Sequence, residues 1–144
     1  MQQFDLIIVG GGLAGASLAL ALRNTRLRIA LVESQPPRRP EGWDARIYAI
    51  SPANIEFLDS IGAWRHLDAE RMVPIRAMEV HGDSGGKLAF SAYETGVPEL
   101  GYILESSLMA RELWETVKRQ GNLSLLCPAR PRDLMLAPDA AVLT

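Results

Sequence analysis

An α/β fold is predicted by three features at the beginning of the chain. Two short apolar runs, Leu6–Val9 and Ile29–Val32, have the composition of parallel strands that are buried on both faces. Between them, Leu13–Arg23 is rich in alanine and leucine and predicts a helix. Three consecutive glycines separate the first run from this helix. The whole segment fits within about 30 residues, which is the size of one βαβ unit.

Helix ends and loops are indicated by residues with special backbone preferences. Asn24-Thr25 should end the first helix, because asparagine tolerates the left-handed conformation. Residues 34–46 predict a loop, since they contain three prolines, three arginines and a glycine. Ser51-Pro52 is a typical helix start, with serine as the N-cap and proline in the first helical position. We expect that helix to end near Ile61 and a further helical stretch to cover Ala63–Arg71.

The second half of the chain predicts a hairpin, a helix and further strands. Met78–His81 and Lys87–Phe90 should pair as a β-hairpin, because Asp83–Gly86 between them has turn-forming composition. Ser106 or Ser107 should cap a further helix. The other expectations are one apolar face on that helix (Met109, Leu113, Val117), a strand at Leu123–Leu126, and an antiparallel pair of Leu134–Leu136 with Ala141–Leu143.

The composition excludes several kinds of site. Of the 144 residues 48% are hydrophobic and 22% charged, and the net charge of −2 offers no basic surface to nucleic acid. The single cysteine, Cys127, cannot form an internal disulfide, which fits a reducing compartment. His66 and His81 have no partners at metal-ligand spacing, so no metal site is expected.

The glycines after the first strand match the dinucleotide-binding pattern Gly-x-Gly-x-x-Gly. Gly10 would make the tight turn, Gly12 would let a pyrophosphate approach the backbone, and Gly15 would let the helix pack closely on the sheet. The N–H groups of the first helical turn, at Leu13 and Ala14, would point at the phosphates. The alternative is a plain glycine-rich turn of an α/β protein.

An acidic residue stands where this pattern requires one. Glu33 ends the second strand, close to the spacing of about 20 residues that is typical of the motif. Its carboxylate would accept hydrogen bonds from the adenosine ribose hydroxyls and would repel a 2′-phosphate. The site therefore suits FAD or NAD rather than NADP, unless Glu33 is only a solvated acid at a strand end.

Three further segments resemble a known family. Arg46–Ser51 (RIYAIS), Leu58–Trp64 (LDSIGAW) and Tyr102–Trp114 resemble the FAD-dependent aromatic-ring hydroxylases, the class A flavin monooxygenases. The likeness is greatest to the branch that hydroxylates the ring in ubiquinone biosynthesis, and it runs over the whole chain. It implies a Rossmann-like FAD-binding domain of the glutathione-reductase type, with a β-hairpin from a substrate-domain sheet.

The resemblance also implies a site and a reaction. Arg46 would contact the flavin diphosphate or ring edge, and Arg111 and Glu105 would lie near the cofactor; the alternative for both arginines is simple solvation. NAD(P)H would be a transient electron donor, and a flavin hydroperoxide would transfer oxygen from O₂ to a prenylphenol-like ring. No catalytic residue and no metal ligand is assigned in this chain. The predicted FAD-binding residues are Gly10, Gly12, Leu13, Ala14, Gly15, Glu33, Arg46 and Arg111.

The chain also departs from the family pattern. Asn24-Thr25-Arg26 replaces a loop that often holds a glycine, and Pro131 has no N–H to offer where the family contacts the adenine. The later Gly-Asp-Gly and Gly-Asp segments of the family are absent before Thr144. We therefore expect an amino-terminal fragment that is inactive by itself. Its predicted parts are residues 1–75 and 101–144 of the FAD-binding domain and residues 76–100 as the hairpin of the substrate-covering sheet.

Two other functions fit the same residues. Another FAD-dependent oxidoreductase, such as an oxidase or dehydrogenase, or an NAD dehydrogenase would share the glycines and Glu33. A non-catalytic nucleotide-binding module would share them too. We expect a cytoplasmic protein, because no apolar stretch reaches the about 20 residues of a membrane-spanning helix. Peripheral association with the inner membrane or with a biosynthetic complex is compatible with this expectation.

Overall fold

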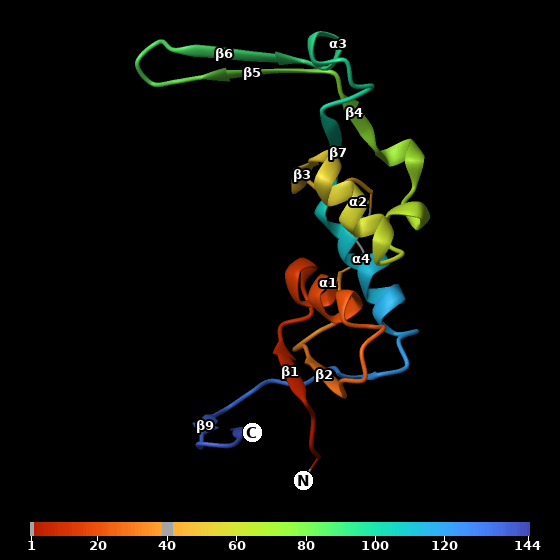
Figure 1. Ribbon diagram of the computed structural model, residues 1–144, viewed down its shortest axis with the longest axis vertical. Coiled ribbons are helices and arrows are strands. Elements are labelled where there is room, and N and C mark those ends of the chain that lie inside the picture. The colour runs from red at the N-terminus through yellow and green to blue at the C-terminus, as the bar shows by residue number, and fades with distance from the viewer. Residues whose placement is uncertain (1, 39–41) are drawn as a thin grey trace. The chain divides into compact units, whose positions relative to one another are not determined.

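The computed structural model describes residues 2–38 and 42–144, which form two compact units (Figure 1). The first unit contains residues 2–38 and 110–144, and the second contains residues 42–109. The domain boundaries predicted from the sequence stay a prediction. No helix among the described residues is long and apolar enough to span a membrane.

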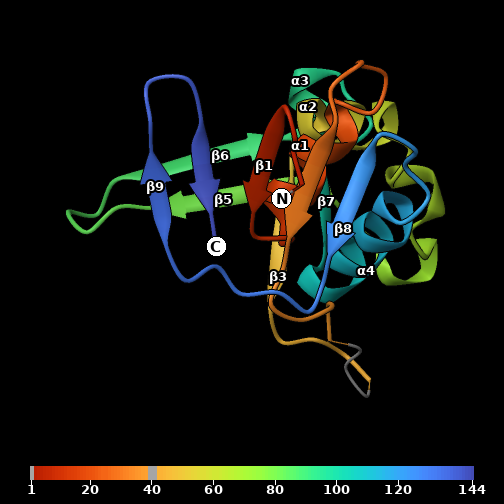
Figure 2. The ribbon, with the colours of Figure 1, turned by 90° about the horizontal axis from the view of Figure 1, so that it is seen from below.

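A parallel three-stranded sheet is the centre of the first unit. Its strands β1 (Leu6–Val9), β2 (Ile29–Val32) and β8 (Leu123–Leu126) lie side by side in the order β1-β2-β8 (Figure 2). All three strands were predicted, and all are confirmed. Every residue of the middle strand β2 is buried. In β1 only Ile8 is buried, so the predicted burial of this strand on both faces is wrong: β1 lies at one end of the sheet.

Helix α1 (Leu13–Ala21) connects β1 to β2 and buries Ala16, Ala19 and Leu20. It ends earlier than predicted. Asn24 does not adopt the left-handed conformation, since no non-glycine residue of the described chain has a positive φ. The connection is held instead by Asn122, whose side-chain amide donates to the carbonyl oxygens of Leu22 and Leu27 at 3.2 and 3.1 Å. This tertiary contact replaces the local helix stop.

Two predicted elements complete the first unit. Helix α4 (Ser106–Val117) belongs to this unit from Ala110 onward and buries Leu113 and Val117, as its apolar pattern predicted. Strands β9 (Leu134–Leu136) and β10 (Ala141–Leu143) form the predicted antiparallel pair.

An antiparallel sheet that the sequence did not predict organises the second unit. It consists of β3 (Ile47–Ile50), β7 (Gly101–Glu105) and β4 (Val73–Ile75), in the order β3-β7-β4. The segments that form β3 and β7 resemble a known family in sequence, but no strand was predicted for them. Pro74 sits in the outer strand β4, which is where a sheet tolerates proline.

Helices and the predicted hairpin make up the rest of this unit. Helix α2 (Pro52–Ser60) agrees with the prediction to within one residue. The helical stretch expected over Ala63–Arg71 is interrupted: the chain forms two separate 3₁₀ turns, η1 (Trp64–His66) and η2 (Ala69–Arg71). Asp68 starts the second turn by accepting a hydrogen bond from the N–H of Glu70 at 3.0 Å. Strands β5 (Ala77–His81) and β6 (Lys87–Ser91) form the predicted hairpin, and the short helix α3 (Ala92–Thr95) follows.

A close approach between backbone segments requires Gly15. A methyl carbon on this residue would overlap the carbonyl oxygen of Gly10 and lie 3.3 Å from Ile8 Cγ2. We expect Gly15→Ala to lower the free energy of unfolding by roughly 3 kcal/mol or more, because the obstacle is backbone that cannot move aside. Urea denaturation measures this. Gly121→Ala is the matched control, since a methyl group there meets no atom within 4 Å; equal effects at both positions would contradict the role of Gly15.

Candidate functional site: the glycine turn and Glu33

The turn between β1 and α1 has the geometry that its glycines predict. Gly10 has a φ of +102°, a value that side chains disfavour, and its N–H donates to the carbonyl of Val32 at 2.8 Å. Gly12 is the N-cap of α1, with φ −69° and ψ −169°. No side chain caps this helix and no acidic residue lies in its first turn. The N–H groups of the first turn, including those of Leu13 and Ala14, are therefore suited to bind an anion.

Gly12 and Gly15 serve different purposes in this turn. A methyl carbon on Gly12 would meet no protein atom within 4 Å, whereas one on Gly15 would overlap the backbone. Of these two glycines, the fold itself thus requires only Gly15. The open space at Gly12 fits a pyrophosphate that approaches the backbone closely.

Glu33 is joined directly to the glycine turn. Its Oε2 accepts a hydrogen bond from the N–H of Gly11 at 2.7 Å, and its Oε1 accepts from Ser34 Oγ at 2.8 Å and from the N–H of Gln35 at 3.0 Å. The backbone hydrogen bond from Gln35, followed by those from Gly11 and Ser34, lowers the pKa of Glu33, although burial opposes the shift. The carboxylate is therefore ionised at neutral pH. Since each carboxylate oxygen accepts about two hydrogen bonds, Oε2 keeps one acceptor position for a ligand.

The two predicted arginines lie in different units. Arg111 is exposed on α4 in the first unit, together with the glycine turn and Glu33, and Arg46 is exposed in the second unit. Neither guanidinium forms a hydrogen bond or a salt bridge with another described residue.

The backbone of Arg46 is fixed although its side chain is exposed. Its N–H donates to Asp44 Oδ1 at 3.0 Å, and its carbonyl accepts from the N–H of Ser106 at 2.8 Å. Asp44 Oδ2 also accepts from the N–H of Ser107 at 3.1 Å, so the first turn of α4 is capped by a distant aspartate rather than by the predicted serines. Backbone hydrogen bonds from Arg46 and Ser107 lower the pKa of Asp44.

Glu105 has a structural partner in the second unit. This residue is only 2% exposed, and Arg71 binds it with two hydrogen bonds, from Nε at 2.8 Å and from Nη2 at 2.6 Å. Its Oε2 also accepts from the N–H of Asp44 at 2.6 Å. The family resemblance implied a place near the cofactor, but in this structure the carboxylate is occupied by the ion pair.

The tryptophans also differ from one another. Trp114 is 7% exposed and Trp64 meets Tyr102 edge-on, whereas Trp43 is 74% exposed and lies 4.6 Å from the guanidinium carbon of Arg71. The ring of Trp43 therefore stacks on an ion pair at the surface instead of packing in a core.

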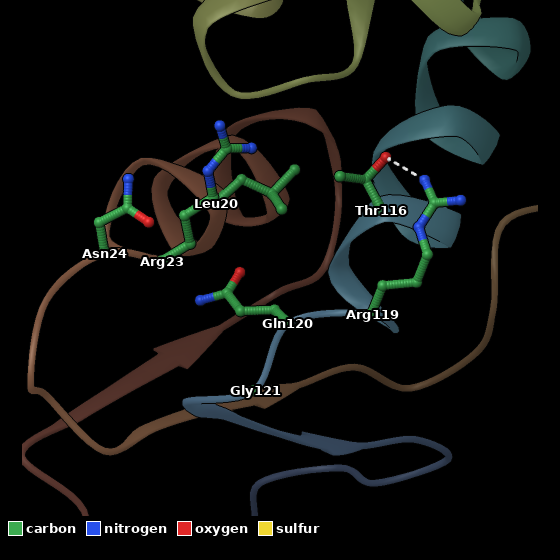
Figure 3. Close-up of a pocket in the computed structure, with 7 residues that line it drawn as sticks. All are labelled: Leu20, Arg23, Asn24, Thr116, Arg119, Gln120 and Gly121. Atoms are coloured by element: carbon green, nitrogen blue, oxygen red, sulfur yellow. Dashed lines mark hydrogen bonds between the residues drawn. The ribbon is translucent and has the colours of Figure 1, made fainter.

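A separate pocket lies between the carboxyl-terminal ends of α1 and α4 (Figure 3). The amide nitrogen of Gln120 donates to the carbonyl of Ala19 at 2.9 Å and to Asn122 Oδ1 at 2.8 Å. Its Oε1 is buried without a partner among the described residues. No group of three or more potential metal ligands was found in the described part of the chain. The pocket residues are Leu20, Arg23, Asn24, Thr116, Arg119, Gln120 and Gly121.

Comparison with known proteins agrees with this geometry. Residues 5–41 match the family described as FAD binding domain. The 3-demethoxyubiquinol 3-hydroxylase of Escherichia coli (strain K12) is 31% identical in an alignment of 130 residues that covers 88% of this chain and 33% of that protein. The mitochondrial ubiquinone biosynthesis monooxygenase COQ6 of Drosophila melanogaster is 31% identical in an alignment of 147 residues that covers 96% of this chain and 31% of that protein. This chain is similar in sequence to hydroxylases of ubiquinone biosynthesis.

The resemblance predicted from the sequence is thereby confirmed. The chain spans about a third of the length of these hydroxylases. Solved structures agree on the fold. OxyS anhydrotetracycline hydroxylase from Streptomyces rimosus superposes with a TM-score of 0.73 at 18% identity, over 99% of this chain and 28% of that one. The p-nitrophenol 4-monooxygenase PnpA from Pseudomonas putida DLL-E4 superposes with a TM-score of 0.70 at 17% identity, over 96% of this chain and 34% of that one.

One residue at the turn was missed by the sequence analysis. Gly11 is buried, and a methyl carbon there would lie 2.9 Å from Trp114 Cζ3 and 3.1 Å from Glu33 Cβ. The signal in the sequence was the middle glycine of the run Gly10–Gly12, because the dinucleotide pattern accepts any residue at that position. Its partner Trp114 comes from α4 and could not be paired with it from sequence alone.

Acid should weaken the fold through Glu33. Because hydrogen bonds lower its pKa, the carboxylate stabilises the folded state above its ordinary pKa of about 4.3, and this contribution is lost as the pH falls through the lowered value. We expect the free energy of unfolding to decline below about pH 4.5 more steeply in the wild type than in Glu33→Gln, which has no carboxylate to protonate. Urea unfolding between about pH 7 and pH 3 measures this. Parallel profiles for the two proteins would contradict the assignment.

Proposed function

We propose that the protein is an FAD-dependent monooxygenase that hydroxylates the aromatic ring of a ubiquinone precursor, with O₂ as the oxygen source and NAD(P)H as the reductant. The observation that carries this proposal is the 31% identity to two ubiquinone-biosynthesis hydroxylases over 88% and 96% of the chain. The substrate would be a quinol or phenol with a prenyl tail. The cellular place that we propose is the cytoplasm, at the surface of the inner membrane.

The first unit would hold the ADP half of the cofactor. The N–H groups of Leu13, Ala14 and Gly15 would bind the pyrophosphate over the open space at Gly12. The free acceptor position on Glu33 Oε2 would take a hydrogen bond from the adenosine ribose. When bound, the flavin would supply the oxygen-transfer chemistry, and the residues of this chain would bind and orient it.

Two arginines are proposed as further cofactor contacts. A guanidinium binds phosphate through two parallel hydrogen bonds, and the side chains of Arg46 and Arg111 are exposed. The fixed backbone of Arg46 supports this role, because less conformational freedom is lost when its side chain binds.

Purified full-length protein should be yellow and contain FAD rather than FMN, because the glycine turn and Glu33 would bind the ADP half that FMN lacks. With NADH or NADPH, O₂ and a prenylated phenol, it should form a product that carries one additional oxygen atom, as measured by mass spectrometry. Residues 1–144 by themselves should not catalyse this reaction, since they span about a third of the related hydroxylases. Reduction of the flavin with release of peroxide only would favour the alternative, another FAD-dependent oxidoreductase. FMN or NAD in the extracted cofactor would refute the proposal.

Gly12→Val should abolish FAD binding and leave the fold intact. Position 12 has an extended conformation that valine adopts, and its Cβ meets no protein atom, so the new side chain would collide only with the pyrophosphate. The free energy of unfolding of the cofactor-free protein should change by no more than about 1 kcal/mol, the cost of a poorer N-cap. Titration with FAD by calorimetry gives the affinity, and urea denaturation gives the stability. An FAD affinity equal to that of the wild type would show that the site is misplaced.

A further inference from the structure

We propose that Trp114 is a positioning residue for the adenosine end of the cofactor. Its indole holds Gly11 against Glu33, and this contact fixes the orientation of the Glu33 carboxylate, which would accept the hydrogen bond from the adenosine ribose. The inference rests on the proposed binding of FAD and adds to it a residue that the dinucleotide pattern does not contain.

The contact is defined by the space around Gly11. The position that a Cβ atom of Gly11 would occupy is 2.9 Å from Trp114 Cζ3, 3.1 Å from Glu33 Cβ and 3.3 Å from Glu33 Cγ. Both side chains therefore crowd the same side of this residue. Gly11 is buried and Trp114 is 7% exposed, so the indole fills the volume that a side chain at position 11 would need.

Backbone conformation does not explain why position 11 is a glycine. Gly11 is absent from the described glycines with a positive φ, so an alanine would adopt its backbone without strain. The obstacle is instead the tryptophan ring, together with the stem of Glu33. This observation separates Gly11 from Gly10, whose φ of +102° itself favours glycine.

The same residue carries the hydrogen bond that orients Glu33. Gly11 N–H donates to Oε2 at 2.7 Å, while Ser34 Oγ and the N–H of Gln35 occupy Oε1. Both acceptor positions of Oε1 are therefore occupied, whereas Oε2 has one left. A ribose hydroxyl that displaces no protein donor must bind at this remaining position of Oε2. The direction of that position depends on where Gly11 lies, and Trp114 limits how Gly11 can move. A displaced Gly11 would therefore misdirect the acceptor and weaken ribose recognition.

The test compares ADP with 2′-deoxy-ADP as ligands of the full-length protein freed of its flavin. A hydrogen bond to a charged group discriminates between them by about tenfold or more in the wild type. Gly11→Ala should reduce this ratio to below about threefold, because the new methyl group pushes the loop away from Trp114. Trp114→Leu should restore most of the ratio in the Gly11→Ala background, since the shorter side chain leaves room for the methyl group.

Melting temperatures and a matched control variant distinguish a positioning role of Trp114 from a purely structural one. Trp64→Leu removes an indole of the second unit, which contacts Tyr102 at a ring-centroid distance of 5.7 Å, and it should leave the ratio unchanged. If Gly11→Ala lowers the melting temperature but keeps the wild-type ratio, Trp114 has only a structural role and the inference is wrong. The inference is also wrong if the double variant Gly11→Ala/Trp114→Leu folds but does not regain its preference for ADP over 2′-deoxy-ADP. Should Trp114→Leu fail to fold, Trp114→Phe replaces it in the same comparison.

The outcomes also distinguish this inference from the function on which it depends. A wild-type protein that binds FAD but does not discriminate between the two nucleotides overturns the positioning role and leaves the cofactor proposal in place. A wild-type protein that binds neither FAD nor ADP overturns both.

Discussion

The hydrogen bond from Gly11 N–H to Glu33 joins the turn after β1 to the end of β2. These two points are adjacent in space because β1 and β2 are parallel, with Val9 opposite Val32. Parallel neighbours bring their carboxyl ends to one edge of the sheet, where a glycine turn and an acidic residue can meet. The uncapped start of α1, the open space at Gly12 and the remaining acceptor position on Glu33 all lie beside this one connection.

Two glutamates at strand ends show how burial decides the use of a carboxylate. Glu33 ends one strand half-buried, its hydrogen-bond donors among the described residues are all neutral, and it keeps an acceptor position. Glu105 ends another strand at 2% exposure, where an unpaired charge would be severely unfavourable, and Arg71 neutralises it with two hydrogen bonds. Removing one partner of such a pair typically destabilises a protein by about 3–5 kcal/mol. The first carboxylate is available to a ligand, and the second maintains the loop that precedes Arg46.

Local sequence determined much of the fold and the centre of the site. The strands of the βαβ unit, helix α2 and the hairpin of β5 and β6 follow from short-range signals: apolar runs, Ser51-Pro52 and the turn at Asp83–Gly86. Gly10, Gly12, Gly15 and Glu33 could be assigned because spacing along one chain segment sets their geometry. The family resemblance could also be predicted from the sequence, because it rests on contiguous segments such as Arg46–Ser51.

Only the tertiary structure decided the contacts between distant segments. Strands β3 and β7 are no shorter than the predicted strands β1 and β2, but their sheet pairs segments that lie far apart in the chain, and no local signal announces that pairing. The helix stop moved because Asn122 binds the carbonyls after α1, and α4 is capped by Asp44. Likewise, the sequence contained Gly11, Trp114, Glu105 and Arg71 but nothing that pairs them. A buried side chain or charge packs against or pairs with whichever residue the fold brings near it. The periodicity of the sequence contains no information about which distant residue that will be.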